Sequence, residues 1–482
     1  MSPDPIVDAI AQCAARAPWR PAVTDGTVTL TYGELWAESD VCAEVLARGG
    51  VRAGEAVGIL LPNCARFVTA LLAIARLRAV ALLLPTTLTP AELHRYAVLA
   101  GAHVVLTGPS HRAVVLEAGG QPVAAAADLL LYTYTVDAPA ARGVGPDDFI
   151  VQLTSGADRP SKLAVRTRAA VWDEIDAFAD AIGLTARETT LVLPSIFHSY
   201  GLIGGTLAPL CRGGRVVLHD NFDPQVVLQA IRRERPTIVF AVPVMYRHLV
   251  RAPQAQGADL SSVRLCFSAG APLPGDVDAA FARRFGCRIS QNYGSTEAGV
   301  IALRQTWAPH LQHSVGRPVR GRTVTVVDDR GRALPPGQRG EVVVCSAAVA
   351  RGYLGDAPGA PVLLPGRFHT GDLGWVDDDG YLFLAGRKSS LIHLTEGTVD
   401  PAAIEAVIAS LPAVRDVAVV GVPGPGGSEQ IKAVVVADDV GPEQILRYCR
   451  HRLPTTQLPA IVELRDAIPR TPAGKVVRRL LR

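Results

Sequence analysis

Lysine is scarce in this chain of 482 residues, although lysine and arginine together number 48. The only lysines are Lys162, Lys388, Lys432 and Lys475, and every other residue in that count is an arginine. The codon bias of a GC-rich genome explains the shortage, but it does not explain where lysine remains. Because lysine and arginine differ in shape and donor geometry, each remaining lysine marks a position to inspect.

Other absences exclude broad classes of protein. The formal net charge is only +3, which argues against a dedicated nucleic-acid surface. None of the eight cysteines belongs to a CxxC motif, and this spacing favours free, mostly buried thiols in a reducing cytoplasm. With 49% apolar and 19% charged residues, the chain is expected to fold rather than to stay disordered.

Long hydrophobic runs are missing as well. The most apolar stretch, Ala70–Leu84, is interrupted by Arg76 and Arg78. It is also shorter than the roughly 20 residues that span a bilayer. Acidic side chains at Asp4 and Asp8 stand where a signal peptide would be basic. We therefore expect a cytoplasmic protein that has no membrane partner.

Strand-like and helix-like patterns alternate along most of the chain. Thr31, followed three residues later by Glu34, predicts a capped helix start, and residues 65–77 predict another helix. Alternation of strands and helices indicates a mainly parallel sheet, whereas the Ala- and Gly-rich residues 114–132 predict no element. Short apolar runs predict strands at residues 56–62, 79–85, 102–107, 148–156, 189–195, 213–219, 236–243, 262–270 and 287–294.

The pattern changes after about residue 313. Short strands joined by Gly and Pro turns predict a small β-rich subdomain at about 313–387. A compact α+β tail follows, with helices from about Pro401 and Pro442. The domain boundary is therefore expected after residue 387. An N-terminal domain would span residues 1–387 and a C-terminal domain residues 388–482.

Two segments offer groups that suit a nucleotide. Residues 154–167 place a hydroxyl-bearing turn and Lys162 after an apolar strand, which suits phosphate, although the spacing is not that of a Walker loop. In the second segment, Tyr293, Thr296 and Glu297 offer a ring for base stacking, a hydroxyl for phosphate and a carboxylate for Mg²⁺. Taken singly, each segment also fits an ordinary polar turn.

Two further segments lie nearer the C-terminus. Asp372 is expected in a tight glycine turn, with Arg387 following several strand-like segments later. An aspartate in such a turn is usually structural. Lys475 follows a Pro/Gly turn and precedes a predicted basic helix, and its alternative is a frayed basic tail.

Taken together, in this order and at these separations, the four segments resemble the adenylate-forming superfamily of acyl- and aryl-CoA synthetases, peptide-synthetase adenylation domains and luciferases. The resemblance covers essentially the whole chain and includes LTYGEL, PSIFHSYGLIGGTLAPLCRGGRVVL and SAGAPLP. It implies an α/β fold, with a large N-terminal domain of doubly wound mixed sheets and a small β-rich subdomain. A small mobile α+β C-terminal domain would follow.

The resemblance also implies a reaction. Members use ATP and Mg²⁺ to convert a carboxylic acid to acyl-AMP with release of pyrophosphate, and then pass the acyl group to a thiol of CoA or phosphopantetheine. By position, Lys475 would reach the α-phosphate bridge and the substrate carboxylate. Glu297 would hold Mg²⁺, Thr296 would contact phosphate, and His198 would lie beside the reacting carboxylate.

The nucleotide would be held by several other positions of the resemblance. Tyr293 would stack on adenine, and Asp372 would accept both ribose hydroxyls with support from Arg387. The remaining positions that the resemblance assigns to nucleotide binding are Thr154, Ser155, Lys162, Gly270, Ala271, Pro272, Asn292 and Gly294.

The acyl pocket is expected around the motif FHSYG. A neutral imidazole at His198 would donate a hydrogen bond to the substrate, and the alternative is a packed core histidine beside Phe197. Apart from Tyr200, the other walls are small or apolar, which favours an aryl or medium acyl acid without a fixed cation partner. The predicted pocket residues are His198, Tyr200, Val242, Met245, Ala269 and Gly294.

Two segments depart from the family's pattern. Ala157, Asp158 and Arg159 stand where the phosphate loop normally has Ser or Thr, Thr and Gly. Either ATP binds more weakly, or Arg159 offsets the charge of Asp158. At the hinge, His393 replaces a lysine and Glu396 takes the place of a tunnel glycine.

These departures leave three hypotheses for the function. The first is an acid–thiol ligase of secondary metabolism. The second is an AMP-dependent ligase whose acceptor is a carrier protein, an amine or an unusual oxyanion such as nitrite. The third is a degenerate paralogue that binds nucleotide or acyl ligand without turnover.

Overall fold

The computed structural model describes residues 4–126, 129–133, 143–154, 162–255, 257–355, 362–394, 397–424, 429–470 and 476–482. They form two compact units. Unit 1 contains the described parts of Met1–Thr154, Ser161–Thr323 and Val344–Phe368, and unit 2 contains those of Val324–Val343 and His369–Arg482. The boundary expected after residue 387 stays a prediction.

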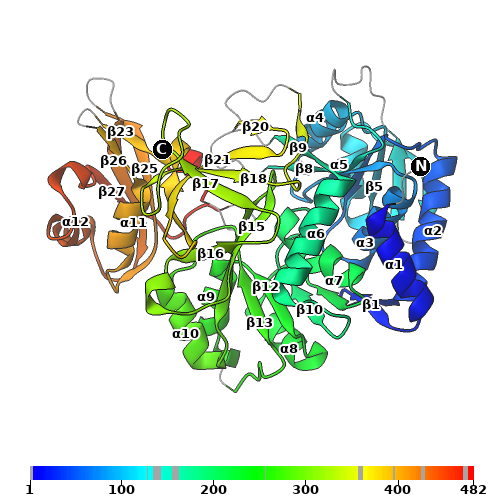
Figure 1. Ribbon diagram of the computed structural model, residues 1–482, viewed down its shortest axis with the longest axis horizontal. Helices are drawn as coiled ribbons and strands as arrows, with labels where there is room; N and C mark the ends of the chain where they lie inside the picture. Colours follow the sequence, from blue (N-terminus) through cyan, green and yellow to red (C-terminus); the bar gives the residue numbers. More distant parts are fainter. Residues whose placement is uncertain are drawn as a thin grey trace. The chain divides into compact units, whose positions relative to one another are not determined.

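Parallel strands form the middle of the first sheet of unit 1 (Figure 1). Within this unit the strand order is β16-β15-β14-β13-β12-β10-β11-β1-β2. All neighbours from β14 to β1 are parallel, and β2, β15 and β16 add antiparallel pairs. The strands are β1 Pro21–Thr24, β2 Thr29–Thr31, β10 Thr189–Val192, β11 Arg215–Leu218, β12 Ile238–Ala241, β13 Leu265–Ser268, β14 Ile289–Ser295, β15 Gly299–Arg304 and β16 Ser314–Pro318.

Alternate side chains of these strands enter different cores. Val192, Phe240 and Phe267 pack on one face with α6, whereas Leu191 and Val239 pack on the other face with α8, α9 and α10. A sheet with helices on both faces is the doubly wound arrangement, so the predicted α/β fold class is confirmed. The helices are α6 Arg168–Ile182, α7 Ala208–Cys211, α8 Pro224–Glu234, α9 Pro243–Arg251 and α10 Gly275–Phe285.

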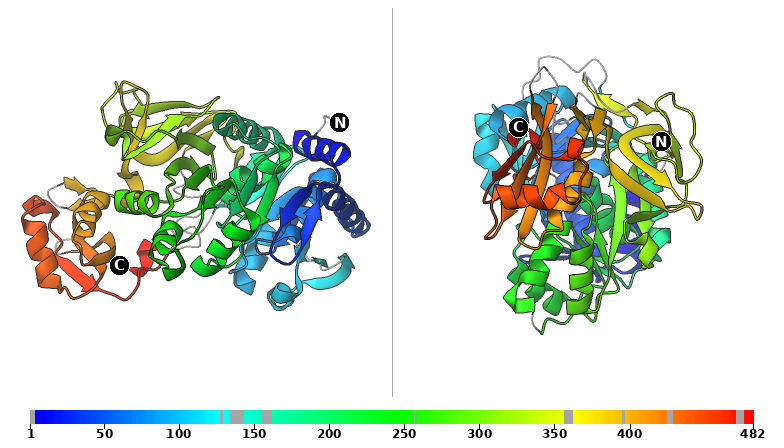
Figure 2. Two further views of the ribbon diagram at one scale, coloured as in Figure 1. Left: turned by 90° about the horizontal axis from the view of Figure 1, so that it is seen from below. Right: turned by 90° about the vertical axis from the view of Figure 1, so that its left-hand side faces the viewer.

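The second sheet of unit 1 has the order β19-β9-β8-β4-β3-β5-β7-β6. Ile59 and Leu83 enter the core that α2, α3 and α6 share with the first sheet, whereas Leu60 and Leu82 pack with α4. Figure 2 shows α1 and α2 side by side at the N-terminal end. The elements are α1 Pro5–Arg16, α2 Tyr32–Arg48, β3 Ala56–Leu60, α3 Ala65–Arg76, β4 Val80–Leu83, α4 Pro90–Ala100, β5 Val104–Thr107, α5 Arg112–Glu117, β6 Gln121–Ala126, β7 Leu129–Thr133, β8 Asp148–Leu153, β9 Leu163–Thr167 and β19 Gly352–Leu354.

Unit 2 consists mainly of antiparallel strands. Strands β17, β18, β21 and β22 are neighbours in that order, and β25, β26 and β27 form a separate sheet. Ile404 of α11 and Ile445 of α12 pack with Val419 and Val435 of that sheet. The elements are β17 Thr323–Val327, β18 Gly340–Cys345, β21 Arg367–Val376, β22 Leu382–Arg387, β23 Ile392–Leu394, β24 Gly397–Val399, α11 Pro401–Ala409, β25 Val414–Pro423, β26 Glu429–Ala437, α12 Pro442–Arg450 and β27 Ile461–Leu464.

Some predicted elements differ from the structure. Residues 114–132, for which no element was predicted, take part in α5, β6 and β7, because β7 pairs with β5 and so extends the second sheet. The basic helix predicted after Lys475 is wrong within the described residues. Only a 3₁₀ turn, Arg478–Leu480, forms there, since a few residues are too short to propagate an α-helix.

The state of the cysteines agrees with the free, mostly buried thiols expected from the sequence. All eight cysteines are free, and Cys42, Cys211, Cys266 and Cys449 are buried. Among the described residues, no helix combines the length and apolar character that a membrane span needs. The cytoplasmic location stays a prediction.

The capping box predicted at Thr31 is present at the start of α2. Thr31 Oγ1 accepts a hydrogen bond from the Glu34 N–H (3.2 Å), and the Glu34 carboxylate accepts from the Thr31 N–H (2.8 Å). We predict that Thr31→Ala lowers the free energy of unfolding by about 1 kcal/mol, measured by urea denaturation. Thr89→Ala at the matching box of α4 should cost a similar amount. A Thr31→Ala protein that is as stable as Thr31→Ser would contradict this role of the hydroxyl.

Candidate active site

Most predicted site residues of unit 1 follow the carboxyl ends of parallel strands. Val192 pairs with Phe240, Ala241 with Ser268, and Ser268 with Gln291. Strands β10, β12 and β13 therefore end at the same edge of the sheet, past which β14 continues to Ser295. Such an edge is where ligands bind in open α/β folds. The residues that continue from this edge are His198, Tyr200, Val242, Met245, Ala269, Gly270, Ala271, Pro272, Asn292, Tyr293 and Gly294.

Hydrogen bonds from other elements hold the segment that carries His198. Asn63 Nδ2 donates to the carbonyl oxygen of Pro194 (2.9 Å). Gln152 of β8 donates through Nε2 to the Phe197 carbonyl (3.2 Å), and its Oε1 accepts from Ser199 Oγ (2.7 Å). Side-chain amides thus join the second sheet to the loop after β10 and fix the backbone around His198.

The predicted pocket residues His198 and Tyr200 contact aromatic rings. The half-buried His198 ring lies 4.3 Å from that of Phe197, between centroids. Tyr200 lies 5.0 Å from the Phe240 ring and donates its hydroxyl hydrogen to the Ala241 carbonyl (3.2 Å). Desolvation raises the pKa of Tyr200 well above its usual value, so this hydroxyl stays protonated.

Tyr200 also begins a π-helical segment, Tyr200–Leu207. Wide turns of this kind are rare and often occur at functional sites. A Cβ at Gly201 would come within 2.9 Å of the Ser195 carbonyl oxygen. Glycine therefore allows the segment to pack against the loop that precedes it.

The strands of the predicted phosphate loop are joined at its base. The Thr154 N–H donates to the Lys162 carbonyl (2.8 Å), and the Lys162 N–H donates to Thr154 Oγ1 (3.3 Å). Lys162 Nζ lies 5.6 Å from the centroid of the Tyr353 ring. Ser155 and the unusual residues 157–159 lie outside the described residues, so the phosphate-binding role of the loop stays a prediction.

A tight hairpin between β14 and β15 carries Thr296 and Glu297. Tyr293 is buried and pairs with Ala302 across the hairpin. A Cβ at Gly294 would overlap the Gly299 carbonyl, and Gly299 itself has a φ of 65°. A residue with a side chain is disfavoured at both positions. The two glycines therefore allow the chain to reverse direction directly after Glu297.

Glu297 is largely buried, and Oε1 of its carboxylate accepts a hydrogen bond from the Tyr353 hydroxyl (2.9 Å). No hydrogen-bond donor of the described part of the chain contacts Oε2. The described residues also contain no cluster of three or more His, Cys, Asp or Glu side chains that could hold a metal. A single carboxylate fits Mg²⁺, which keeps several waters and binds substrate phosphates, rather than a metal caged by protein ligands.

Asp372 and Arg387 belong to unit 2. They are directly opposite each other on β21 and β22, with 2.6 Å between Arg387 Nε and Asp372 Oδ1. The tight turn predicted for Asp372 is wrong, because pairing with β22 keeps the residue extended. Lys475 lies outside the described residues, so its role stays a prediction.

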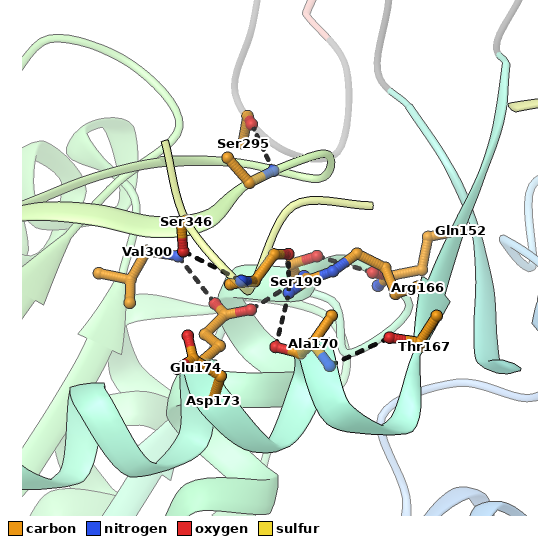
Figure 3. A network of polar contacts seen from close by, with 12 residues as sticks. Gln152, Arg166, Thr167, Ala170, Asp173, Glu174, Ser199, Ser295, Val300 and Ser346 are labelled. Carbon is orange, nitrogen blue, oxygen red and sulfur yellow. Dashed lines mark hydrogen bonds and ion pairs between the residues drawn. The ribbon is translucent and has the colours of Figure 1, made fainter. Parts of the chain in front are cut away.

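Three residues near Glu297 were missed by the sequence analysis. Tyr353 contacts the carboxylate directly, and a buried ion pair between Arg166 and Glu174 lies behind the hairpin (Figure 3). An arginine inside the apolar run LAVRT is the signal that could have revealed this pair. The run was assigned only to the phosphate loop, and its buried partner is remote in the sequence.

Comparison with known proteins identifies two matching family models. The model described as AMP-binding enzyme matches residues 10–354, and that described as AMP-binding enzyme C-terminal domain matches residues 403–475. A feruloyl-CoA synthase from Amycolatopsis sp is 35% identical over 475 residues, which cover 96% of each chain.

Solved structures show the same similarity. ATP-bound MatB from Rhodopseudomonas palustris superposes with a TM-score of 0.87 at 25% identity, covering 99% of this chain and 98% of MatB. The amide bond synthetase McbA from Marinactinospora thermotolerans gives a TM-score of 0.84 at 29% identity, covering 98% and 99% of the two chains.

The contact between Tyr353 and Glu297 generates a prediction. Tyr353→Phe leaves a buried carboxylate oxygen without its donor. We expect ATP binding in the presence of Mg²⁺ to weaken about tenfold, as for other residues that orient metal ligands, while ATP binding without Mg²⁺ stays close to wild type. Isothermal titration calorimetry measures both affinities. Tyr246→Phe is the control, because it removes another buried hydroxyl, one that donates to the Phe267 carbonyl. Equal losses in the two variants would contradict the role of Tyr353.

Proposed function

The chain belongs to the AMP-binding enzyme family, and on that basis we propose that it activates a carboxylic acid with ATP as acyl-AMP. Pyrophosphate leaves in this step, and the acyl group then passes to a thiol with release of AMP. The family confirms the predicted adenylate-forming resemblance and the predicted class of AMP-forming ligase. The observation that most supports the reaction is the buried Glu297 carboxylate, which follows the edge where the parallel strands end.

Attack of the carboxylate on the α-phosphate concentrates negative charge on the phosphate oxygens. The site must therefore position the two reacting groups and neutralise this charge. In this proposal Glu297 holds Mg²⁺ and Thr296 donates to a phosphate oxygen. The bound Mg²⁺ supplies positive charge at the phosphates. Tyr353 joins the phosphate-loop lysine to the metal site, because its hydroxyl contacts Glu297 and its ring faces Lys162.

Lys475 provides the second ammonium of the proposal, near the α-phosphate and the reacting carboxylate. A compact charge on a flexible stem suits a group that enters and leaves a site. For the nucleotide, Tyr293 stacks on adenine beside Gly270, Ala271 and Pro272. Asp372 accepts the ribose hydroxyls, and its ion pair with Arg387 orients the carboxylate for this purpose.

The acid is proposed to be an aryl or medium acyl carboxylic acid. Tyr200, Val242 and Ala269 give the predicted pocket apolar or aromatic walls without a charged group. His198 lies at the same sheet edge, where a neutral imidazole can donate to the carboxylate. The similarity to a feruloyl-CoA synthase, named for an aryl acid, supports the aryl choice.

CoA is the proposed acceptor, and a second acceptor class is also supported. His393 replaces the expected lysine, and the similarity to McbA, an amide bond synthetase, favours an amine as the alternative. In the structure the His393 N–H donates to Glu429 Oε2 (2.8 Å) and the residue is exposed on β23. Glu396, the other departure, lies outside the described residues. A carrier-protein phosphopantetheine is the thiol alternative to CoA.

Lys475→Ala tests the proposed reaction. Loss of a charge that acts in the transition state should lower acid-dependent ATP–pyrophosphate exchange by about 10²–10³. Lys432→Ala is the matched control, because Lys432 pairs with Glu463 in the C-terminal sheet (2.6 Å) and has no predicted catalytic role. Exchange at the wild-type rate in Lys475→Ala would refute the assignment.

A panel of acids tests the substrate class. We predict the fastest exchange with aryl or medium acyl acids and little with long-chain acids. With the best acid, CoA and a primary amine are then offered separately, and mass spectrometry identifies the product. Acyl-adenylate without acyl-CoA would support the alternative acceptors. No exchange with any acid would support the hypothesis of a non-catalytic paralogue.

A further inference from the structure

A buried ion pair lies behind the hairpin that carries Glu297. Arg166 of β9 and Glu174 of α6 approach to 2.9 Å between Nη1 and Oε2, with side chains only 0% and 6% exposed. Charged side chains are rarely this buried. Their partners therefore show what the pair holds in place.

The two oxygens of the Glu174 carboxylate have different partners, one on the hairpin and one on β9 (Figure 3). Oε1 accepts a hydrogen bond from the Val300 N–H (2.9 Å), while Oε2 faces Arg166. A Cβ at Gly299 would overlap the same carboxylate. The close approach of Glu174 and Gly299 fixes the chain two to three residues after Glu297.

Arg166 holds a different segment, residues 348–350, which contacts the backbone of Glu297. Its Nη2 donates to the Ala348 carbonyl (3.0 Å). Two residues later, the Ala350 N–H donates to the Glu297 carbonyl (2.6 Å). The backbone of Glu297 is thus tied to a segment that Arg166 anchors, and the Tyr353 that contacts its carboxylate lies on β19, which pairs with β9.

We propose that Arg166 and Glu174 are positioning residues for Glu297: their ion pair aligns the hairpin so that the Glu297 carboxylate meets Mg²⁺. The inference rests on the proposed function, in which Glu297 is the metal ligand. Neither residue touches substrate. Glu174 acts through the backbone that follows Glu297, and Arg166 acts through residues 348–350, which contact the Glu297 carbonyl.

Glu174→Gln tests the proposal with little change of volume. The Val300 N–H and Arg166 Nη1 face different oxygens of the Glu174 carboxylate. A glutamine places an NH₂ donor at one of these two positions, so one of the two contacts becomes a contact between donors. We expect the Mg²⁺ concentration that gives half-maximal ATP–pyrophosphate exchange to rise about tenfold, as for other residues that orient metal ligands. The KM for the acid should stay near the wild-type value.

A second variant guards against failure to fold. Arg166→Met combined with Glu174→Met replaces the pair with apolar side chains, which buried ion pairs often tolerate without loss of stability. The contact of Glu174 with the Val300 N–H and that of Arg166 with the Ala348 carbonyl are both lost in this variant as well. The same shift in Mg²⁺ dependence is therefore expected.

Asp4→Asn is the matched control. Asp4 forms a second buried ion pair at α6, with Arg168, and the two side chains are 7% and 6% exposed. Arg168 donates to the carbonyls of Pro146 and Ala79 rather than to the hairpin. This variant should keep the wild-type Mg²⁺ dependence. Folded Glu174 variants with unchanged dependence, or an equal shift in Asp4→Asn, would overturn the proposal.

Hydrogen exchange measured by mass spectrometry gives a readout that needs no activity. Without nucleotide, peptides containing residues 295–300 should exchange faster in Glu174→Gln than in wild type or Asp4→Asn. Wild-type protein without acid-dependent exchange of pyrophosphate would refute the proposed function alone. Unchanged hydrogen exchange at the hairpin would refute the positioning role, whatever the activity.

Discussion

The site of unit 1 depends on one constraint, which is that neighbouring parallel strands end at the same edge of a sheet. Strands β10, β12 and β13 obey it, with Val192 beside Phe240 and Ser268 beside Gln291 of β14. The loops after these three strands therefore begin together, next to the continuing strand β14, although they are far apart in the sequence. Helices on both faces bury the sheet and leave this edge as the place where polar side chains can gather.

Buried polar side chains that form hydrogen bonds with loop backbone are a second constraint on the site. Asn63 and Gln152 hold the segment before and around His198, and Glu174 holds the Glu297 hairpin. Burial makes each unpaired group costly, so these hydrogen bonds fix segments that also place apolar side chains such as Ile196 and Val300 in the core. Such rigidity matters for a reaction that works by positioning charge.

Much of the fold and part of the site could be predicted from local patterns. The Thr31 capping box and the strands at 56–62, 189–195 and 236–243 follow from short-range rules, because caps and apolar runs act on neighbouring residues. No element was predicted for the Ala- and Gly-rich residues 114–132, since β7 depends on its pairing with β5, which is remote in the sequence. The turn predicted at Asp372 was wrong for the same reason, because the extended conformation of this residue comes from pairing with β22.

The sequence by itself determined the family, the α/β class and the candidate residues His198, Thr296 and Glu297, because motifs and apolar periodicity are written along the chain. Only the tertiary structure decided what supports them. The contact of Tyr353 with Glu297 and the ion pair of Arg166 with Glu174 join elements that are distant in the sequence. Their physical basis is the cost of burial, because ionised and hydroxyl side chains are tolerated in the interior only where folding brings a partner within hydrogen-bond distance.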